Sequence, residues 1–314
     1  MLIGVVAAPL STSGLGPQPN PIGDYAAAAA AATRRQHVDD SVAAPGGESL
    51  LLAHGHRTPR VVVLLHGFTN SPTQFAVLAK QLYDAGDNVY VPRLPEHAER
   101  GVTASALARL TAEQLRGSAD SAIDIAAGLG DSVIVLGLSA GGTMACWIAQ
   151  NRPEVERAVI VAPVIALARV PRLLDAPLLR LSVRLPNFTH ADPIDAEEPD
   201  REQGWTSRAV GQILLLGLAV RRDAANTAPA TRDVRVLLNA HDHTISASAV
   251  LDIARSWATH GAMVQAYELP DSLGLPHDVI DPRQRVARPD VVYPLLIALA
   301  HGESAPPSRV RRRE

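Results

Sequence analysis

Short β-branched runs alternate with amphipathic stretches along most of this chain. The run Val61–Leu65 is apolar throughout, as expected of a strand that is buried on both faces of a sheet. After this run, apolar residues recur at helical spacing as far as Gly86, and glycine commonly ends a helix. The same reasoning predicts five further strands, at Asn88–Val91, Ser132–Leu136, Ala158–Val161, Val234–Leu238 and Met263–Leu269. The alternation predicts an α/β fold, with a mostly parallel central sheet and helices on both faces.

Several local patterns refine this prediction. Ser49–Ala53 precedes the first buried run and is suited to an antiparallel edge strand. The stretch Thr103–Ala127 favours a helix that is broken near Gly117, because glycine is a poor helix former. Ala26–Ala32 favours a short helix near the beginning of the chain.

The regular spacing of strands is interrupted once, between Val161 and Val234. The roughly 70 intervening residues are far more than the usual length of a connection between strands in such sheets. They contain two leucine-rich amphipathic pieces, Leu173–Leu185 and Val210–Val220, separated by prolines and the acidic stretch Asp195–Asp200. We interpret this insert as a helical cap that packs over the end of the sheet.

These patterns divide the chain into four kinds of segment. The predicted bounds are a partly irregular arm at 1–48, an α/β core at 49–162 and 233–303, a cap at 163–232, and a basic tail at 304–314. Within the arm, Asn20–Tyr25 could dock on the core, or the arm could be surface padding. The arginines of the tail, Arg309 and Arg311–Arg313, are typical of a solvated, frayed terminus.

Composition excludes several classes of protein. The 29 basic and 32 acidic residues give a net charge of −3, which provides no overall field for a nucleic acid backbone. The single cysteine, Cys146, excludes intrachain disulfides and a cysteine-rich metal site. No apolar run approaches the roughly 20 residues of a membrane span.

Ile3–Leu10 is apolar but lacks the preceding Lys or Arg of a secretory signal, so a cytoplasmic location is favoured over secretion. The oligomeric state is left open.

The segment Gly137–Gly141 (Gly-Leu-Ser-Ala-Gly) directly follows a predicted strand and precedes a helical stretch, Gly142–Gln150. A strand-to-helix elbow of this kind forces Ser139 into a strained turn above the sheet, and small neighbours keep the turn free of collisions. The Ala140 backbone N–H then lies at a helix N-terminus, where it can face a developing oxyanion.

A second backbone donor is expected from His66-Gly67-Phe68, immediately after the Val61–Leu65 strand. Ligands of open α/β sheets collect at the carboxyl ends of strands, which makes the Phe68 N–H the candidate. For His66 we favour a structural role, in which its ring holds the loop by hydrogen bonds.

Ser139 needs a base, because a hydroxyl is a weak nucleophile until its proton is removed. His277 follows the last predicted strand, at the same end of the sheet as the elbow. Asp242 follows the strand Val234–Leu238 and would fix the tautomer and orientation of that histidine. Three nearby side chains compete for these roles: Asp278 as the carboxylate, and His241 and His243 as the base.

These residues together resemble the α/β-hydrolase superfamily, and within it the capped bacterial carboxylesterases and monoacylglycerol lipases, over about Arg60–Ala300. The resemblance implies a Ser-Asp-His order, with these roles: Ser139 as nucleophile, Asp242 as orienter, His277 as base, and backbone donors at Phe68 and Ala140. Such esterases often read Gly-His-Gly after the second strand of the sheet, where this chain has Leu94–Glu99.

The expected function is hydrolysis of a small-molecule carboxylic ester through an acyl-enzyme, with no metal and no organic cofactor. The leucines of the predicted cap suggest short to medium acyl chains, although packing on the core explains them more simply. An acyltransferase or thioesterase could use the same serine, and a non-catalytic ligand receptor could keep the same fold. The sequence leaves these alternatives open.

Overall fold

The computed structural model of the protein describes residues 9–101, 106–191, 204–305 and 310–313. Its centre is an eight-stranded sheet with the order β1-β3-β2-β4-β5-β8-β9-β10. The strands are β1 Leu50–Leu52, β2 Thr58–Leu65, β3 Asn88–Val91, β4 Gly130–Leu138, β5 Val155–Val161, β8 Asp233–Asn239, β9 Met263–Leu269 and β10 Arg311–Arg313. All neighbouring pairs from β3 to β9 are parallel.

The strand predictions are confirmed. β2 lies between β3 and β4, and Val61–Leu65 is completely buried, as the unbroken apolar run requires. The predicted edge strand is also present, because β1 pairs with β3 in the antiparallel sense. The carboxyl ends of β2, β4, β8 and β9 therefore meet along one edge of the sheet, where the loops bearing the candidate residues begin.

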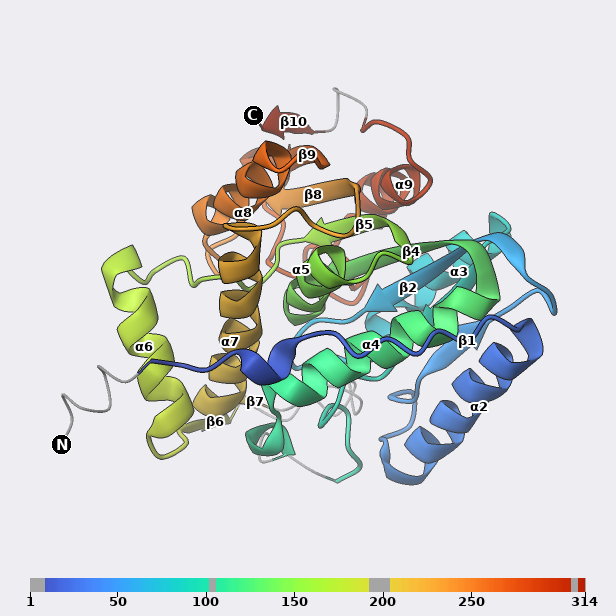
Figure 1. Ribbon diagram of the computed structural model, residues 1–314, viewed down its shortest axis with the longest axis horizontal. Coiled ribbons are helices and arrows are strands. Elements are labelled where there is room, and N and C mark those ends of the chain that lie inside the picture. The colour runs from blue at the N-terminus through green and yellow to red at the C-terminus, as the bar shows by residue number, and fades with distance from the viewer. Residues whose placement is uncertain (1–8, 102–105, 192–203, 306–309, 314) are drawn as a thin grey trace.

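Helices cover both faces of this sheet (Figure 1). α4 and α5 cross the near face, and α3 and α9 lie behind it. The helices of the described residues are α2 Tyr25–Val42, α3 Ala76–Asp84, α4 Ala112–Leu129, α5 Ala140–Asn151, α6 Arg172–Arg184, α7 Ser207–Ala224, α8 Ala247–Thr259 and α9 Pro289–Ala300. The predicted α/β fold class is confirmed.

The predicted break near Gly117 is wrong, because α4 runs without interruption through this residue. The helix begins later than expected: Ala106–Arg109 forms a separate 3₁₀ turn, and Thr111 caps α4 in a capping box with Gln114. One glycine costs a helix about 1 kcal/mol. Burial of the apolar side of α4 against the sheet outweighs this cost.

The helix at the beginning of the chain is much longer than the predicted Ala26–Ala32. α2 continues to Val42, and near its end the buried carboxylate of Asp39 forms an ion pair with Arg93 at 2.9 Å. Local propensity could not indicate this extension, since Arg93 lies far along the sequence. The segment Asn20–Tyr25 docks on the core, where the Ile22 amide donates to the Asp124 carbonyl at 2.9 Å.

The prediction of a frayed basic tail is wrong for its last residues, whereas Arg309 lies outside the described residues. Arg311–Arg313 forms β10, which pairs with β9 in the antiparallel sense and places Arg311 opposite Glu268. The physical reason is that β9 would otherwise leave the hydrogen-bonding groups of a sheet edge unpaired.

The long insert contains α6 and α7, close to the two predicted amphipathic pieces, and a small sheet of β6 Thr189–Ala191 with β7 Gly204–Thr206. α7 packs against α5 and α6 lies outside α7 (Figure 1). The acidic stretch Asp195–Asp200 lies outside the described residues. The division into core and cap stays a prediction. No described helix combines the length and apolar character needed to cross a bilayer.

Candidate active site

Ser139 occupies the turn between β4 and α5. Its backbone has φ +59° and ψ −114°, a conformation that L-residues rarely adopt and that costs about 1–3 kcal/mol. The turn is held by hydrogen bonds: the Ser139 amide donates to the Val161 carbonyl at 3.0 Å, and the Ser139 carbonyl accepts from the Thr143 amide at 2.9 Å. The serine hydroxyl is thereby presented at the end of the sheet, as the elbow pattern predicts.

The glycines of the elbow are required by close backbone approach. A Cβ on Gly141 would collide with the carbonyl of Leu65, and a Cβ on Gly137 would collide with the backbone of Gly141. A Cβ on Gly142 would lie 2.8 Å from the Val161 carbonyl oxygen. The turn therefore packs directly against the neighbouring strands, and only glycine fits at these positions.

The structure brings three predicted side chains together. His277 Nε2 lies 2.8 Å from Ser139 Oγ, and His277 Nδ1 lies 2.6 Å from Asp242 Oδ2. Because a carboxylate only accepts, the ring proton is on Nδ1 and the Nε2 lone pair faces the serine hydroxyl. This tautomer can accept the proton of Ser139.

The carboxyl of Asp242 is held in its charged form. Burial raises its pKa, but the hydrogen bond and charge of His277 and the backbone amides of Thr244 and Ile245 oppose this, so that the net pKa lies below its usual range. The Thr244 amide donates to Asp242 Oδ1 at 2.7 Å. Asp242 is thus an ionised acceptor that can stabilise an imidazolium on His277.

The competing side chains have other partners. His241 Nδ1 lies 2.8 Å from Asp271 Oδ1, and its ring is tilted against that of His243. The Asp278 carboxylate accepts from the side chain of Gln74 at 2.7 Å. The Ser139 hydroxyl donates its hydrogen bond to His277 Nε2, which favours the first choice made from the sequence.

Sequence reasoning missed Asn239, the last residue of β8. Its side-chain amide donates to the carbonyls of Leu275 and Pro276 at 2.9 and 3.0 Å. These contacts fix the loop that leads into His277. An asparagine after a strand is typical of a turn former, so no sequence signal distinguished it.

The two loops that carry the predicted backbone donors adjoin the serine. Ala140 is the first residue of α5, directly after Ser139. Gly67, which precedes Phe68, also approaches Ser139: a Cβ built on Gly67 would lie 3.6 Å from Ser139 Cβ. The Gly141 amide donates to the His66 carbonyl at 3.1 Å and ties the two loops together. The Ala140 and Phe68 amides therefore belong to adjoining loops, as an oxyanion hole requires.

His66 has the structural role that the sequence favoured. The Leu94 amide donates to its Nε2 at 3.0 Å, so the proton is on Nδ1, which lies 3.0 Å from the Gly67 carbonyl oxygen. Burial is the main reason that the pKa of His66 lies well below its usual range, and the nearby His97 lowers it further. A neutral imidazole thus joins the loops after β2 and β3.

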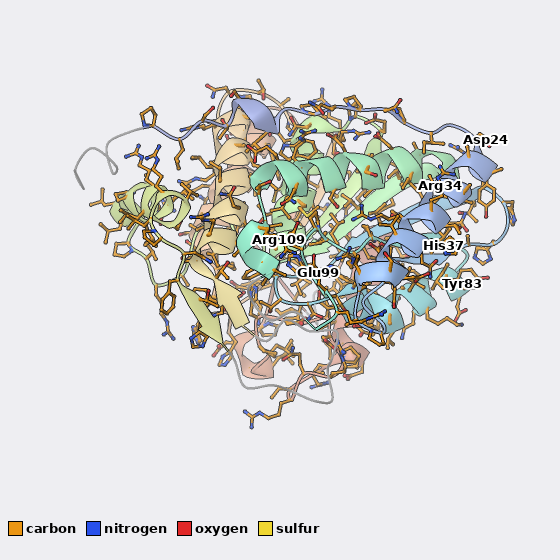
Figure 2. The ribbon with its side chains drawn as sticks, turned by 90° about the horizontal axis from the view of Figure 1, so that it is seen from below. Asp24, Arg34, His37, Tyr83, Glu99 and Arg109 are labelled. Carbon is orange, nitrogen blue, oxygen red and sulfur yellow. The ribbon has the colours of Figure 1, made fainter. Side chains whose placement is uncertain are left out.

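The loop Leu94–Glu99 contains no glycine, although two of its residues adopt backbone conformations that are typical of glycine. Glu96 and Ala98 have φ +63° and +54°, in the left-handed region that glycine tolerates best. They flank His97 as the two glycines flank the histidine in Gly-His-Gly. Arg109 donates to Glu96 at 2.8 Å and to Glu99 at 2.7 Å, and Figure 2 shows Glu99 and Arg109 close together. Ion pairs therefore hold this strained loop.

His97 should make the protein sensitive to acid. Its ring is completely buried, and burial lowers its pKa from 6.5 to about 4, although a hydrogen bond to the Pro95 carbonyl opposes the shift. Between these pH values the unfolded chain binds a proton and the folded protein does not. Stability is therefore full above pH 6.5 and falls as the pH drops towards 4, by about 3 kcal/mol from this group.

The measurement is the free energy of unfolding in denaturant, at several pH values across this window. His97→Gln should show a flatter slope than the wild type. His37→Gln, which changes an exposed histidine of α2 (Figure 2), should retain the wild-type slope. Equal slopes for the wild type and His97→Gln would contradict the prediction.

A cavity of about 460 Å³ lies between α6, α7 and the segment that follows β5. Leu178 and Leu179 from the leucine-rich piece line it, whereas Leu173 on the same helix is 91% exposed. The remaining apolar lining includes Ile165, Leu167, Leu214 and Leu218. Packing on the core therefore does not account for every leucine of this piece.

The sequence is similar to that of known hydrolases. A model described as the alpha/beta hydrolase family matches residues 62–305. The thermostable monoacylglycerol lipase of Bacillus sp. (strain H-257) is 24% identical over 188 residues, which cover 60% of this chain and 72% of that relative. No group of three or more His, Cys, Asp or Glu among the described residues could hold a metal ion.

Two of the solved structures that are similar to this chain illustrate the shared fold. One belongs to the metagenome-derived lipolytic enzymes LipS and LipT, with a TM-score of 0.60, 19% identity and coverage of 83% of this chain and 100% of that chain. The other is the Paleococcus ferrophilus monoacylglycerol lipase, with a TM-score of 0.55, 13% identity and coverage of 82% of this chain and 98% of that chain. At these identities the matches establish the fold alone.

Proposed function

The chain belongs to the alpha/beta hydrolase family, and on that premise we propose that it is a serine hydrolase of carboxylic esters with short to medium acyl chains. One observation carries the proposal: His277 Nε2 lies 2.8 Å from Ser139 Oγ while its Nδ1 binds Asp242. This is the arrangement that activates a serine hydroxyl towards a carbonyl carbon.

The reaction proceeds in two steps. Ser139 Oγ attacks the ester carbonyl as His277 takes its proton, and the amides of Phe68 and Ala140 stabilise the oxyanion. The carbon–oxygen bond to the alcohol then breaks, and the alcohol leaves with the proton from His277. Water, deprotonated by the same histidine, hydrolyses the acyl-enzyme and releases the acid.

The leucines of α6 and α7 support the choice of an aliphatic acyl chain of moderate length. Those that line the cavity of about 460 Å³ share it with charged side chains, among them Arg172, Asp175 and Arg221, and Ser139 is not part of its lining. The relative from Bacillus is a monoacylglycerol lipase, which favours esters over other acyl derivatives. Hydrolysis is therefore proposed ahead of acyl transfer and thioester cleavage.

A panel of p-nitrophenyl esters tests this function. We expect kcat/KM to rise about tenfold from acetate to butyrate, because two buried methylenes contribute about 1.5 kcal/mol. It should reach a maximum by octanoate and fall at palmitate. Activity on the acetate ester alone would contradict the proposed preference for short to medium acyl chains. No turnover of any ester, together with no labelling of Ser139 by a fluorophosphonate, would contradict the hydrolase.

A further inference from the structure

One carboxylate joins the loop of the proposed base to the loop of a proposed oxyanion donor. Asp278, the residue after His277, accepts through Oδ2 from Gln74 Nε2 at 2.7 Å and from Asn70 Nδ2 at 3.2 Å. A longer contact at 3.4 Å comes from Gln284. Its other oxygen, Oδ1, accepts from two amides of its own loop, those of Ile280 and Asp281, each at 3.0 Å.

Gln74 continues this connection to the backbone. Its side chain is 1% exposed, and its Oε1 accepts from the Gly67 amide at 2.8 Å. Both ends of the side-chain amide are therefore engaged, with its donor on Asp278 and its acceptor on Gly67. The result is a continuous chain of hydrogen bonds from the His277 loop to the loop after β2.

The Gly67–Phe68 peptide unit is fixed on its carbonyl side as well. The Gly67 carbonyl accepts from the backbone amide of Asn70 at 3.2 Å and lies 3.0 Å from His66 Nδ1. In a trans peptide the N–H of the next residue points away from this carbonyl. The orientation of the Phe68 amide is thereby set by Asn70, His66 and the Gln74 bond to Gly67.

We propose that Asp278 and Gln74 are positioning residues, whose hydrogen bond keeps the Phe68 amide in register with His277. The proposal rests on the proposed hydrolase function. Neither side chain touches a reacting atom. Their bond links the group that moves the proton to the group that stabilises the oxyanion, and displacement of a catalytic group by about 1 Å can cost about a hundredfold in rate.

A merely structural role for Asp278 makes a different prediction. If the carboxylate only closed the turn through the amides of Ile280 and Asp281, its loss would lower the melting temperature and leave kcat of the folded enzyme unchanged. A positioning role lowers kcat with little change in KM, because the displaced donor acts on the transition state.

The test is an exchange of donor and acceptor across the bond. In Asp278→Asn the new amide group faces the Gln74 amide group, so that two donors meet. In Gln74→Glu two carboxylates meet. In the double variant the amide of residue 278 donates to the carboxylate of residue 74, which still accepts from the Gly67 amide. The double variant therefore restores the connection with its polarity reversed.

We expect each single variant to lower kcat on p-nitrophenyl butyrate by about 10- to 100-fold, with KM within about twofold of the wild type. The double variant should recover to within about fivefold of the wild type. The Asn70 side chain loses its acceptor on residue 278 both in Asp278→Asn and in the double variant. A higher kcat in the double variant therefore cannot come from this contact. Asp290→Asn, an exposed carboxylate of α9, is the matched control and should retain wild-type kcat.

Several outcomes would overturn the positioning role. These are wild-type kcat in both folded single variants, or a double variant that is folded yet slower than each single variant. If a single variant fails to fold, the double variant must still fold and recover activity, or the proposal is wrong. An inactive wild type whose Ser139 does not react with a fluorophosphonate would instead contradict the proposed function itself.

Discussion

Ser139→Ala is expected to lower kcat on p-nitrophenyl esters by up to about a million-fold, with no loss of folding. The reason is that the hydroxyl is the proposed nucleophile, and no other described side chain takes its place beside His277 Nε2. Alanine keeps the small size that the elbow requires. The measurement is kcat, combined with fluorophosphonate labelling and a thermal melt.

The control for this variant is Ser41→Ala. Ser41 is an exposed serine near the end of α2, where its hydroxyl donates only to the Val38 carbonyl in the same helix. We expect wild-type turnover and wild-type labelling from this control. Turnover by folded Ser139→Ala within about tenfold of the wild type would refute the nucleophile assignment.

Asp242→Asn should have the next largest effect, a loss of about ten-thousandfold in kcat. An amide group at this position donates to His277 Nδ1, which moves the ring proton to Nε2. That nitrogen then faces Ser139 with a hydrogen and cannot accept the serine proton. The Thr244 amide can still donate to the remaining oxygen of residue 242, so the loop itself should persist.

The chain offers a matched control on a second Asp–His pair. Asp271→Asn makes the same change beside His241, whose Nδ1 lies 2.8 Å from the Asp271 carboxylate. This variant should keep wild-type kcat. The reverse result, with loss of activity in Asp271→Asn and not in Asp242→Asn, would assign the base to His241 and would refute the role of His277.

The sheet and the elbow could be predicted because their signals are local. An unbroken apolar run such as Val61–Leu65 has few alternatives to a central strand, and Gly137–Gly141 follows a strand closely enough to indicate its own turn. Asp242 and His277 also follow predicted strands, at four residues after Leu238 and eight residues after Leu269. Parallel strands bring such distant positions to one edge of the sheet.

Features that depend on remote partners could not be predicted in this way. The extended end of α2 carries the buried ion pair of Asp39 with Arg93, and α4, which passes through Gly117, packs on the sheet. The roles of Asn239 and Gln74 depend on which backbone groups lie opposite them. Their residue types alone are as typical of turns and short helices as of a catalytic centre.

The C-terminal strand has a consequence for how molecules of this protein meet. β10 adds three consecutive arginines to one margin of the sheet, and the side chains of Arg311 and Arg312 are exposed. A second molecule that approached with the same sheet edge would bring guanidinium groups against guanidinium groups. Their repulsion therefore opposes edge-to-edge aggregation by strand addition, which an unpaired β9 edge would favour.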